Sequence, residues 1–265
     1  MNKTKTYVVV SDTQIPYHDR KATAAVIRFI GAYQPDHVVQ IGDLMDYPQP
    51  SRWSKDTRAE FEGSIFEDSE LAKQKFLAPL REVFSGPVGV IEGNHDSRPR
   101  DYLAKYAPAL AESHAFDLPV LLDFQRFEVE LLPDFYRFAD GWVMCHGHKG
   151  GISLARTAGS TALNAARKFG VSVICGHTHR LGQVHHTTGY DARITSQLTG
   201  VEVGHLMDMS LAGYLKRATA NWQSGFALVH VTGEHVHVQT IPITDGKFTV
   251  DAITYSITER NPLTS

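Results

Sequence analysis

Residues 7–46 read YVVVSDTQIPYHDRKATAAVIRFIGAYQPDHVVQIGDLMD, and their pattern indicates the start of an α/β fold. Residues 7–10 and 37–41 are short apolar runs rich in β-branched side chains, which favour strands. Between them, residues 20–33 place apolar side chains at the spacing of one helical face. This strand–helix–strand order is typical of a βαβ unit with a buried pair of parallel strands.

Each conspicuous cluster of Asp, Asn or His in the chain follows a short apolar segment. In order, the clusters are DTQ at residues 12–14, GDLMD at 42–46, GNHD at 93–96, HGH at 146–148 and GHTH at 176–179. Ligand sites of open α/β sheets form beyond the carboxyl ends of the strands, so we expect these clusters to converge. Carboxylate, amide and imidazole groups are ligands that suit manganese, iron, zinc or nickel without any thiolate.

Other segments predict additions to this α/β core. Residues 47–85 begin with turn-rich sequence and continue as a polar, helix-prone segment, which indicates a helical insertion. Residues 226–231 and 235–241 alternate apolar and polar side chains around a short turn and are predicted strands. A length of 265 residues fits one large domain or two small ones.

Charge and cysteine content exclude several classes of protein. With 26 basic and 29 acidic side chains, the chain is not expected to bind duplex DNA or an anionic membrane. Cys145 and Cys175 cannot form a disulfide framework, and each ends an apolar run, which indicates buried free thiols in a reducing compartment. The first apolar run is too short for a signal peptide or a membrane span. We therefore expect a cytoplasmic protein.

Taken together, the five clusters resemble the motifs of the calcineurin-like metallophosphoesterases, over residues 12–179. The family pattern is D-x-H, G-D-x-x-D, G-N-H-D/E, H within an HG step, and G-H-x-H, and this chain carries a D-x-Q variant of the first motif. The resemblance implies an α/β fold, a four-layer α/β/β/α sandwich of two mixed β-sheets flanked by helices. It implies a single domain over residues 1–265, in which C-terminal strands within 192–256 complete the second sheet.

The resemblance also implies a binuclear metal centre. The ligands of one metal would be Asp12, Gln14, Asp43 and His179, and those of the other Asn94, His146 and His177, with Asp43 bridging both. Gln14 stands where the family usually has histidine, and its neutral amide oxygen is a weaker donor that favours a harder ion such as manganese; iron, nickel and zinc are the alternatives. His95 would be the catalytic acid or a phosphate contact, oriented by Asp96.

Several further residues have two interpretations each. Arg98, His148 and Arg180 are candidates for substrate contacts, because guanidinium and imidazole groups bind phosphate, but helix-start, supporting or surface roles fit them equally well. Trp53, Phe61 and Phe66 can be read as stacking partners for a base, although core packing of an inserted helix is the favoured interpretation.

The function predicted from these residues is metal-dependent phosphodiester hydrolysis of a nucleotide-like phosphate ester. Two metal ions would activate a bridging water, and His95 would protonate the leaving group. The alternatives are a manganese-dependent DNA or RNA nuclease that acts on strand ends, and a non-catalytic binding scaffold on the same fold. The partner expected is a phosphate-ester substrate, with no membrane and no duplex DNA, and the sequence leaves the oligomeric state open.

Overall fold

The first of two large β-sheets has the strand order β11-β10-β1-β2-β3-β4 in a computed structural model that describes residues 3–51, 54–211 and 220–258. Its parallel part consists of β1 (Lys5–Val10), β2 (His37–Gln40), β3 (Val88–Ile91) and β4 (Val129–Leu132). Its antiparallel part consists of β10 (Gly225–Thr232) and β11 (His235–Pro242). The helix α1 (Arg20–Tyr33) connects β1 to its parallel neighbour β2, which confirms the predicted βαβ unit.

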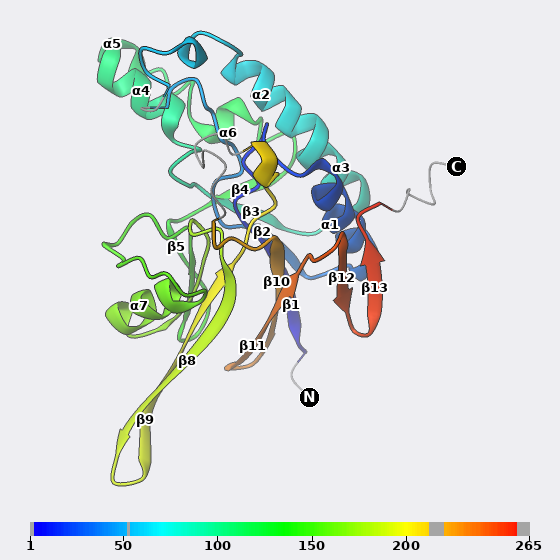
Figure 1. The fold of residues 1–265 in the computed structure, drawn as a ribbon, viewed down its shortest axis with the longest axis vertical. Coiled ribbons are helices and arrows are strands. Elements are labelled where there is room, and N and C mark those ends of the chain that lie inside the picture. Colours follow the sequence, from blue (N-terminus) through cyan, green and yellow to red (C-terminus); the bar gives the residue numbers. More distant parts are fainter. Residues whose placement is uncertain (1–2, 52–53, 212–219, 259–265) are drawn as a thin grey trace.

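The second sheet has the order β5-β6-β7-β9-β8. Its strands are β5 (Phe135–Ala139), β6 (Trp142–Cys145), β7 (Ser172–Cys175), β8 (Leu181–Tyr190) and β9 (Arg193–Val203). β6, β7 and β9 run parallel to one another, whereas β5 and β8 pair antiparallel at the two edges. The β8–β9 hairpin extends well beyond the rest of the sheet (Figure 1).

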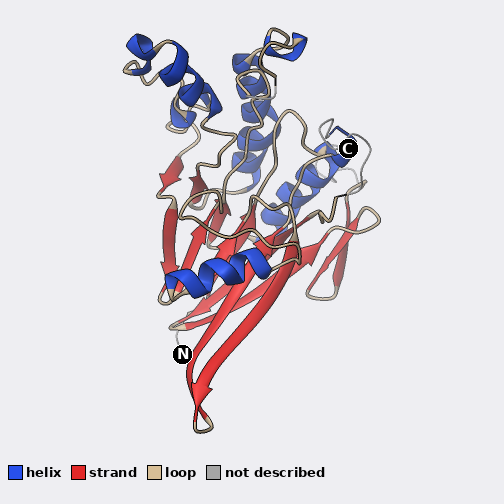
Figure 2. Ribbon diagram, turned by 60° about the vertical axis from the view of Figure 1, so that its left-hand side comes forward, coloured by secondary structure: helices blue, strands red, loops and turns tan. Residues whose placement is uncertain are grey.

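Three apolar clusters separate four layers. Val8 and Val10 on one face of β1 pack toward α1, whereas Tyr7 and Val9 on the other face join a cluster shared with β6, β7 and β9. A third cluster lies between the second sheet and α7 (Ser160–Phe169), whose alanines pack on Cys145 and Cys175. Both faces of each central strand are therefore buried, which is why these strands are continuously apolar. The order of layers confirms the predicted α/β/β/α sandwich (Figure 2).

The C-terminal strands differ from the prediction that residues 192–256 complete the second sheet. Of the described residues in this range, only β9 lies in that sheet, and β10 pairs instead with the free edge of β1 in the first sheet. Ala227 and Val229 of β10 pack between the sheets, and Phe226 and Leu228 pack toward α1. Because β10 is apolar on both faces, it is stabilised in a sheet that is covered on both sides. The last strands, β12 (Lys247–Val250) and β13 (Ile253–Ser256), form a separate hairpin.

Helices do form within the predicted insertion at 47–85. They are η1 (Arg58–Glu60), α2 (Ile65–Ala72), the π-helical turn η2 (Lys73–Leu77) and α3 (Ala78–Val83). Phe76, Leu77 and Leu80 are buried against the core that contains α1. In contrast, Phe61 is 81% exposed and Phe66 is 58% exposed, so core packing was the wrong interpretation for these two rings. Trp53 lies outside the described residues.

A second group of helices follows β3. α4 (Arg98–Tyr106) and α5 (Pro108–Ala111) stand apart from the sheets on the same side as α2, and α6 (Leu118–Leu121) leads toward β4 (Figure 1). A short η3 (Met209–Leu211) lies after β9. Among the helices in the described part of the chain, none has the length and apolar character needed to cross a bilayer.

A buried carboxylate on β9 fixes the start of α7. Glu202 is fully buried, and its two oxygens accept hydrogen bonds from the backbone N–H groups of Gly159, at 2.9 Å, and Thr161, at 3.0 Å. A negative charge at this end of a helix is stabilised by the helix dipole, and it satisfies N–H groups that have no partner within the helix. Glu202 therefore positions the loop before α7, which borders the candidate site.

Candidate metal centre

The carboxyl ends of β1, β2 and β3 in one sheet meet those of β6 and β7 in the other. Backbone hydrogen bonds join the loops: the N–H of Asp12 donates to the carbonyl of Gly42 at 3.0 Å, and the N–H of Gly176 donates to that of His146 at 3.0 Å. A Cβ at Gly176 would overlap the Ser11 hydroxyl and crowd the Asp12 carboxylate, so glycine at this position permits the close approach of the two loops. The predicted convergence of the sequence clusters thus depends on close packing between the two sheets.

Much of this site has an unusual backbone conformation. Among the candidate site residues, five non-glycine residues adopt positive φ, namely Asp12 (49°), Gln14 (51°), Asp43 (53°), His177 (67°) and His179 (58°). Such conformations cost free energy in residues with a Cβ, and they persist where surrounding structure holds them in place. All five are residues predicted to bind metal. The loops hold these side chains at an angle that ordinary strand geometry would not give.

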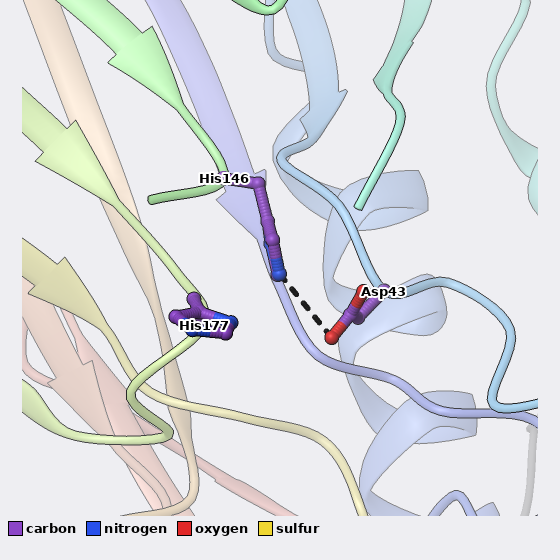
Figure 3. Close-up of side chains that lie close together, drawn as sticks. All are labelled: Asp43, His146 and His177. Carbon is purple, nitrogen blue, oxygen red and sulfur yellow. Dashed lines mark ion pairs between the residues drawn. The ribbon is translucent and has the colours of Figure 1, made fainter. Parts of the chain in front are cut away.

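One group of candidate ligands comprises Asp43, His146 and His177, whose ligand atoms all lie within 4.8 Å of one another (Figure 3). The Nδ1 atom of His146 donates to the carbonyl of Ile41 at 3.0 Å, so Nε2 is the ring atom that faces the site. This Nε2 lies 3.2 Å from Oδ2 of Asp43 and 3.2 Å from Oδ1 of Asn94. The predicted second metal set therefore gathers around one imidazole nitrogen.

The electrostatics of this group fit a cation. Burial disfavours charge on His146, but the adjacent carboxylate of Asp43 outweighs burial and raises the pKa of His146 to about 9. Burial likewise opposes ionisation of Asp43, and His146 and His95 nevertheless hold the pKa of that carboxyl well below its usual range. A proton on His146 balances the buried carboxylate, and a divalent ion bound by the same atoms would displace this proton.

A second group lies at the ends of β1 and β7. The Nε2 atom of His179 is 3.2 Å from Oδ1 of Asp12 and 3.0 Å from the amide nitrogen of Gln14. The amide oxygen of Gln14 is buried and accepts no hydrogen bond from any described residue. A half-turn of the amide about its terminal bond brings this oxygen to face His179 instead. Carboxylate, amide oxygen and imidazole then form a donor set that suits a divalent transition metal.

His95 lies beside Asp43, and 17% of its side chain is exposed. Its Nε2 atom is 3.9 Å from Oδ2 of Asp43, and its Nδ1 atom is 2.7 Å from Oδ1 of Asp46. Burial disfavours charge on His95, but Asp43 and the hydrogen bond to Asp46 outweigh burial and raise the pKa of His95. Arg98 donates to the carbonyl of Asp46 at 2.6 Å and approaches Nε2 of His95 at 3.0 Å.

Asp96 has a different role from the one predicted. Its carboxylate is fully buried and accepts hydrogen bonds from the backbone N–H groups of Asp43, Met45 and Gly93, each at 2.8 Å. Both oxygens are therefore occupied by the loops after β2 and β3, and the prediction that Asp96 orients His95 is wrong. Burial and the neighbouring Asp43 raise the pKa of Asp96 to about 7. Asp96 holds the loop that carries Asp43, and Asp46 holds the imidazole.

The other candidates lie around the same centre. The ring of His148 is 5.2 Å from that of His146, and burial together with His146 lowers the pKa of His148 to about 4. His148 is thus a neutral neighbour of the first group of ligands. Arg180 lies beside a surface pocket that His177 also lines, whereas Arg98 lies on the side of His95. The predicted contacts Arg98 and Arg180 therefore flank the centre from different loops.

Sequence reasoning missed three residues at the site. Asp46 belongs to the quoted GDLMD cluster but had no assigned role, although its spacing from Asp43 was a usable signal. His205 is buried, with its ring 5.6 Å from that of His179, and it follows β9 as the other clusters follow their strands. Trp222 packs 4.3 Å from the His179 ring, and no pattern in the sequence indicates this contact.

Comparison with known proteins identifies close relatives in mycobacteriophages. Two proteins called Gene 54 protein, from Mycobacterium phage L5 and Mycobacterium phage D29, are each 55% identical to this chain over 254 residues, which is 96% of this chain and 99% of each relative. Among solved structures, Vacuolar Protein Sorting 29 from Cryptosporidium parvum is similar with a TM-score of 0.47 and 14% identity, covering 96% of this chain and 98% of that one.

The sequence profile of one protein family matches the part of the chain that contains the candidate metal centre. This family is described as calcineurin-like phosphoesterase, and its profile matches residues 5–181, which is more than half of the chain. The matched region includes the two sheet ends that carry the aspartates, Asn94 and the histidines of the candidate metal centre. The chain therefore belongs to the calcineurin-like phosphoesterase family.

Proposed function

We propose that this protein is a metal-dependent phosphodiesterase that hydrolyses nucleotide-like phosphate esters. The single observation that supports this most strongly is that Asp43, His146 and His177 bring their candidate ligand atoms within 4.8 Å of one another, beside His95. Family membership supports metal-dependent phosphoesterase chemistry in general. We propose the preference for diesters and the nucleotide-like substrate in addition to what family membership supports.

We propose two divalent ions, most simply manganese, as the cofactors. Asp12, Gln14 and His179 would hold one ion, Asn94, His146 and His177 would hold the other, and Asp43 would contact both. Gln14 favours a hard ion, because its amide oxygen is the donor where the family usually has an imidazole. When bound, such a pair of ions supplies an activated water and neutralises charge on the phosphoryl oxygens.

His95 is the proton donor in this proposal. The hydrogen bond between Nδ1 and Asp46 orients the ring and leaves Nε2 facing the site, 3.9 Å from Oδ2 of Asp43. A leaving oxygen near Nε2 can then take the proton of the imidazolium as the ester bond breaks. Arg98 contacts Nε2 only when this atom is unprotonated, so we place the guanidinium on the phosphate when substrate is bound.

The preference for diesters follows from the cations near His95. Arg98 is the one guanidinium that contacts His95 within the described residues, and Asp46 already pairs with it at 3.5 Å. A diester carries one negative charge at the phosphate, whereas a monoester dianion needs more compensation. The side chains around His95 therefore suit the single negative charge of a diester better than the two charges of a monoester.

A hydrolysis screen tests the proposal. Purified protein is assayed on nucleotide monoesters, nucleotide diesters and bis(p-nitrophenyl) phosphate, each with manganese, iron, nickel and zinc. We expect turnover of diesters, highest with manganese, and faster than turnover of monoesters. The absence of hydrolysis with every metal would instead support a non-catalytic scaffold. Degradation of a labelled oligonucleotide from its end, with no action on mononucleotide diesters, would support a nuclease.

We also place the protein in the cytoplasm. Cys145 and Cys175 are both free and buried, and burial raises the pKa of the Cys145 thiol to about 12. Unpaired thiols of this kind fit a reducing compartment.

A further inference from the structure

A surface pocket of about 400 Å³ lies directly beside the metal centre. It is lined by His177 and Thr178 from the loop after β7, by Arg180, and by Leu154, Ala155 and Arg156 from the loop before α7. This volume lies in the range of small-molecule sites, which combine apolar walls with a few polar groups. Since His177 is shared with the candidate metal centre, a ligand in the pocket adjoins a phosphate at that centre.

The pocket is lined by two arginines that pair with no carboxylate among the described residues. Neither Arg156 nor Arg180 forms an ion pair with a carboxylate in the described part of the chain, unlike Arg98 and Arg100. The Nε atom of Arg180 is buried and donates to no described residue. A buried donor without an acceptor is unfavourable, and a bound anion that accepts from it removes this cost. Guanidinium groups bind phosphate oxygens in a paired, planar geometry.

The loop that carries Arg156 is held in place before any ligand binds. The carbonyl of Arg156 accepts a hydrogen bond from the Asn221 side chain at 3.0 Å, and the N–H of Ala155 donates to the Thr161 hydroxyl at 3.0 Å. Leu154 on the same loop is 64% exposed, which gives the pocket an apolar edge. An ordered loop loses little conformational entropy on binding, so its arginine is well placed for recognition.

We propose that this pocket binds a second phosphate group of the substrate, next to the phosphate that is hydrolysed. The inference rests on the proposed function for its location, because the scissile phosphate is placed at the metal centre beside His177. The group that enters the pocket is a phosphate separated from the scissile phosphate by one nucleoside. The sugar or base of that nucleoside would lie against Leu154. Both a nucleoside bisphosphate and a short strand end contain this arrangement.

Inhibition constants test the proposal without fixing which side of the scissile bond enters the pocket. Hydrolysis of bis(p-nitrophenyl) phosphate with manganese is measured against thymidine 3′,5′-bisphosphate, thymidine 5′-monophosphate and thymidine 3′-monophosphate. We expect the bisphosphate to inhibit at about tenfold lower concentration than either monophosphate, the effect of about one charge-assisted interaction. Arg156→Ala and Arg180→Gln should each reduce this advantage to about twofold. Arg193→Ala, an exposed arginine on the β8–β9 hairpin, is the matched control and should keep it.

Binding measurements separate failure of this inference from failure of the proposed function. Calorimetry on the manganese-loaded His95→Ala protein measures affinity for the same ligands without turnover. A preference for the bisphosphate in calorimetry, with no hydrolysis by the wild type, would support the pocket and contradict the enzyme. Hydrolysis with equal inhibition by all three nucleotides, or an advantage retained in both arginine variants, would overturn the pocket and leave the enzyme. If the dinucleotide pdTpdT binds as tightly as the bisphosphate, the ligand is a strand end. If pdTpdT binds more weakly, the ligand is a free nucleotide.

Discussion

The imidazole of His95 is oriented by Asp46, whose Oδ1 lies 2.7 Å from Nδ1, and not by the adjacent residue Asp96. The Asp96 carboxylate points the other way and binds three backbone N–H groups. Two carboxylates near one histidine thus act on different parts of the site, one on the proposed acid and one on the loop that carries Asp43. Separate variants distinguish these roles.

Replacement of Asp46 should change the pH dependence of catalysis. The Asp46 hydrogen bond contributes to the raised pKa of His95, so it keeps the ring protonated to higher pH. Asp46→Asn lowers that pKa, and the descending alkaline limb of kcat should move to lower pH. Above this limb we expect a loss of about tenfold or more in kcat. The measurement is a pH–rate profile on an ester with an alkoxide leaving group, and a profile identical to the wild type would contradict the role of Asp46.

Asp96→Asn should act on stability and not on the pH profile. The amide can accept from fewer of the three N–H groups, and its own NH2 would face one of these donors. We expect a loss of about 2 kcal/mol in the free energy of unfolding, together with weaker metal binding. Urea unfolding of the metal-free protein gives the first quantity. An alkaline limb shifted as in Asp46→Asn would restore Asp96 as the residue that orients His95.

The effect of removing His95 should depend on the leaving group. His95→Ala removes the proton donor, so an ester with an alkoxide leaving group should lose about 10²- to 10⁴-fold in kcat. A p-nitrophenolate leaving group is stable without a proton, and its ester should lose far less. Comparison of the two substrates on one preparation of the variant measures this difference directly. Equal losses would indicate that His95 binds phosphate and does not donate a proton.

The position of the candidate site could be predicted because its candidate ligands follow strands in the sequence. The runs before Asp12, Asp43 and Asn94 are apolar because both faces of their strands are buried. The apolar runs therefore located the strands, and the ends of the strands located these three residues. The partner strand of β10 could not be predicted, because an antiparallel strand with two apolar faces fits the free edge of either sheet. The exposure of Phe61 could not be predicted from the sequence either, because it depends on which turn of the insertion packs against α1.

The buried cap on α7 should contribute to the stability of the whole chain. Glu202→Gln keeps one acceptor oxygen but removes the charge and turns an NH2 group toward a backbone N–H of Gly159 or Thr161. We expect the free energy of unfolding to fall by about 2 kcal/mol. Glu234→Gln, at the exposed turn between β10 and β11, is the matched control and should change it little. Equal urea midpoints for the two variants would show that the cap contributes nothing measurable.

Metal-dependent hydrolysis by this site is tested most directly by the manganese-dependent turnover of bis(p-nitrophenyl) phosphate by Asn94→Ala, with metal content determined on the same samples. Asn94 faces His146 from the loop after β3, and a metal ligand at this position is required by the proposed mechanism. Gln197→Ala, which removes an exposed amide on β9, is the control. We expect Asn94→Ala to fold as the wild type does, bind less metal and lose turnover, whereas Gln197→Ala keeps full activity. Full-rate hydrolysis by Asn94→Ala would show that this metal position is not needed for turnover, against the proposed function.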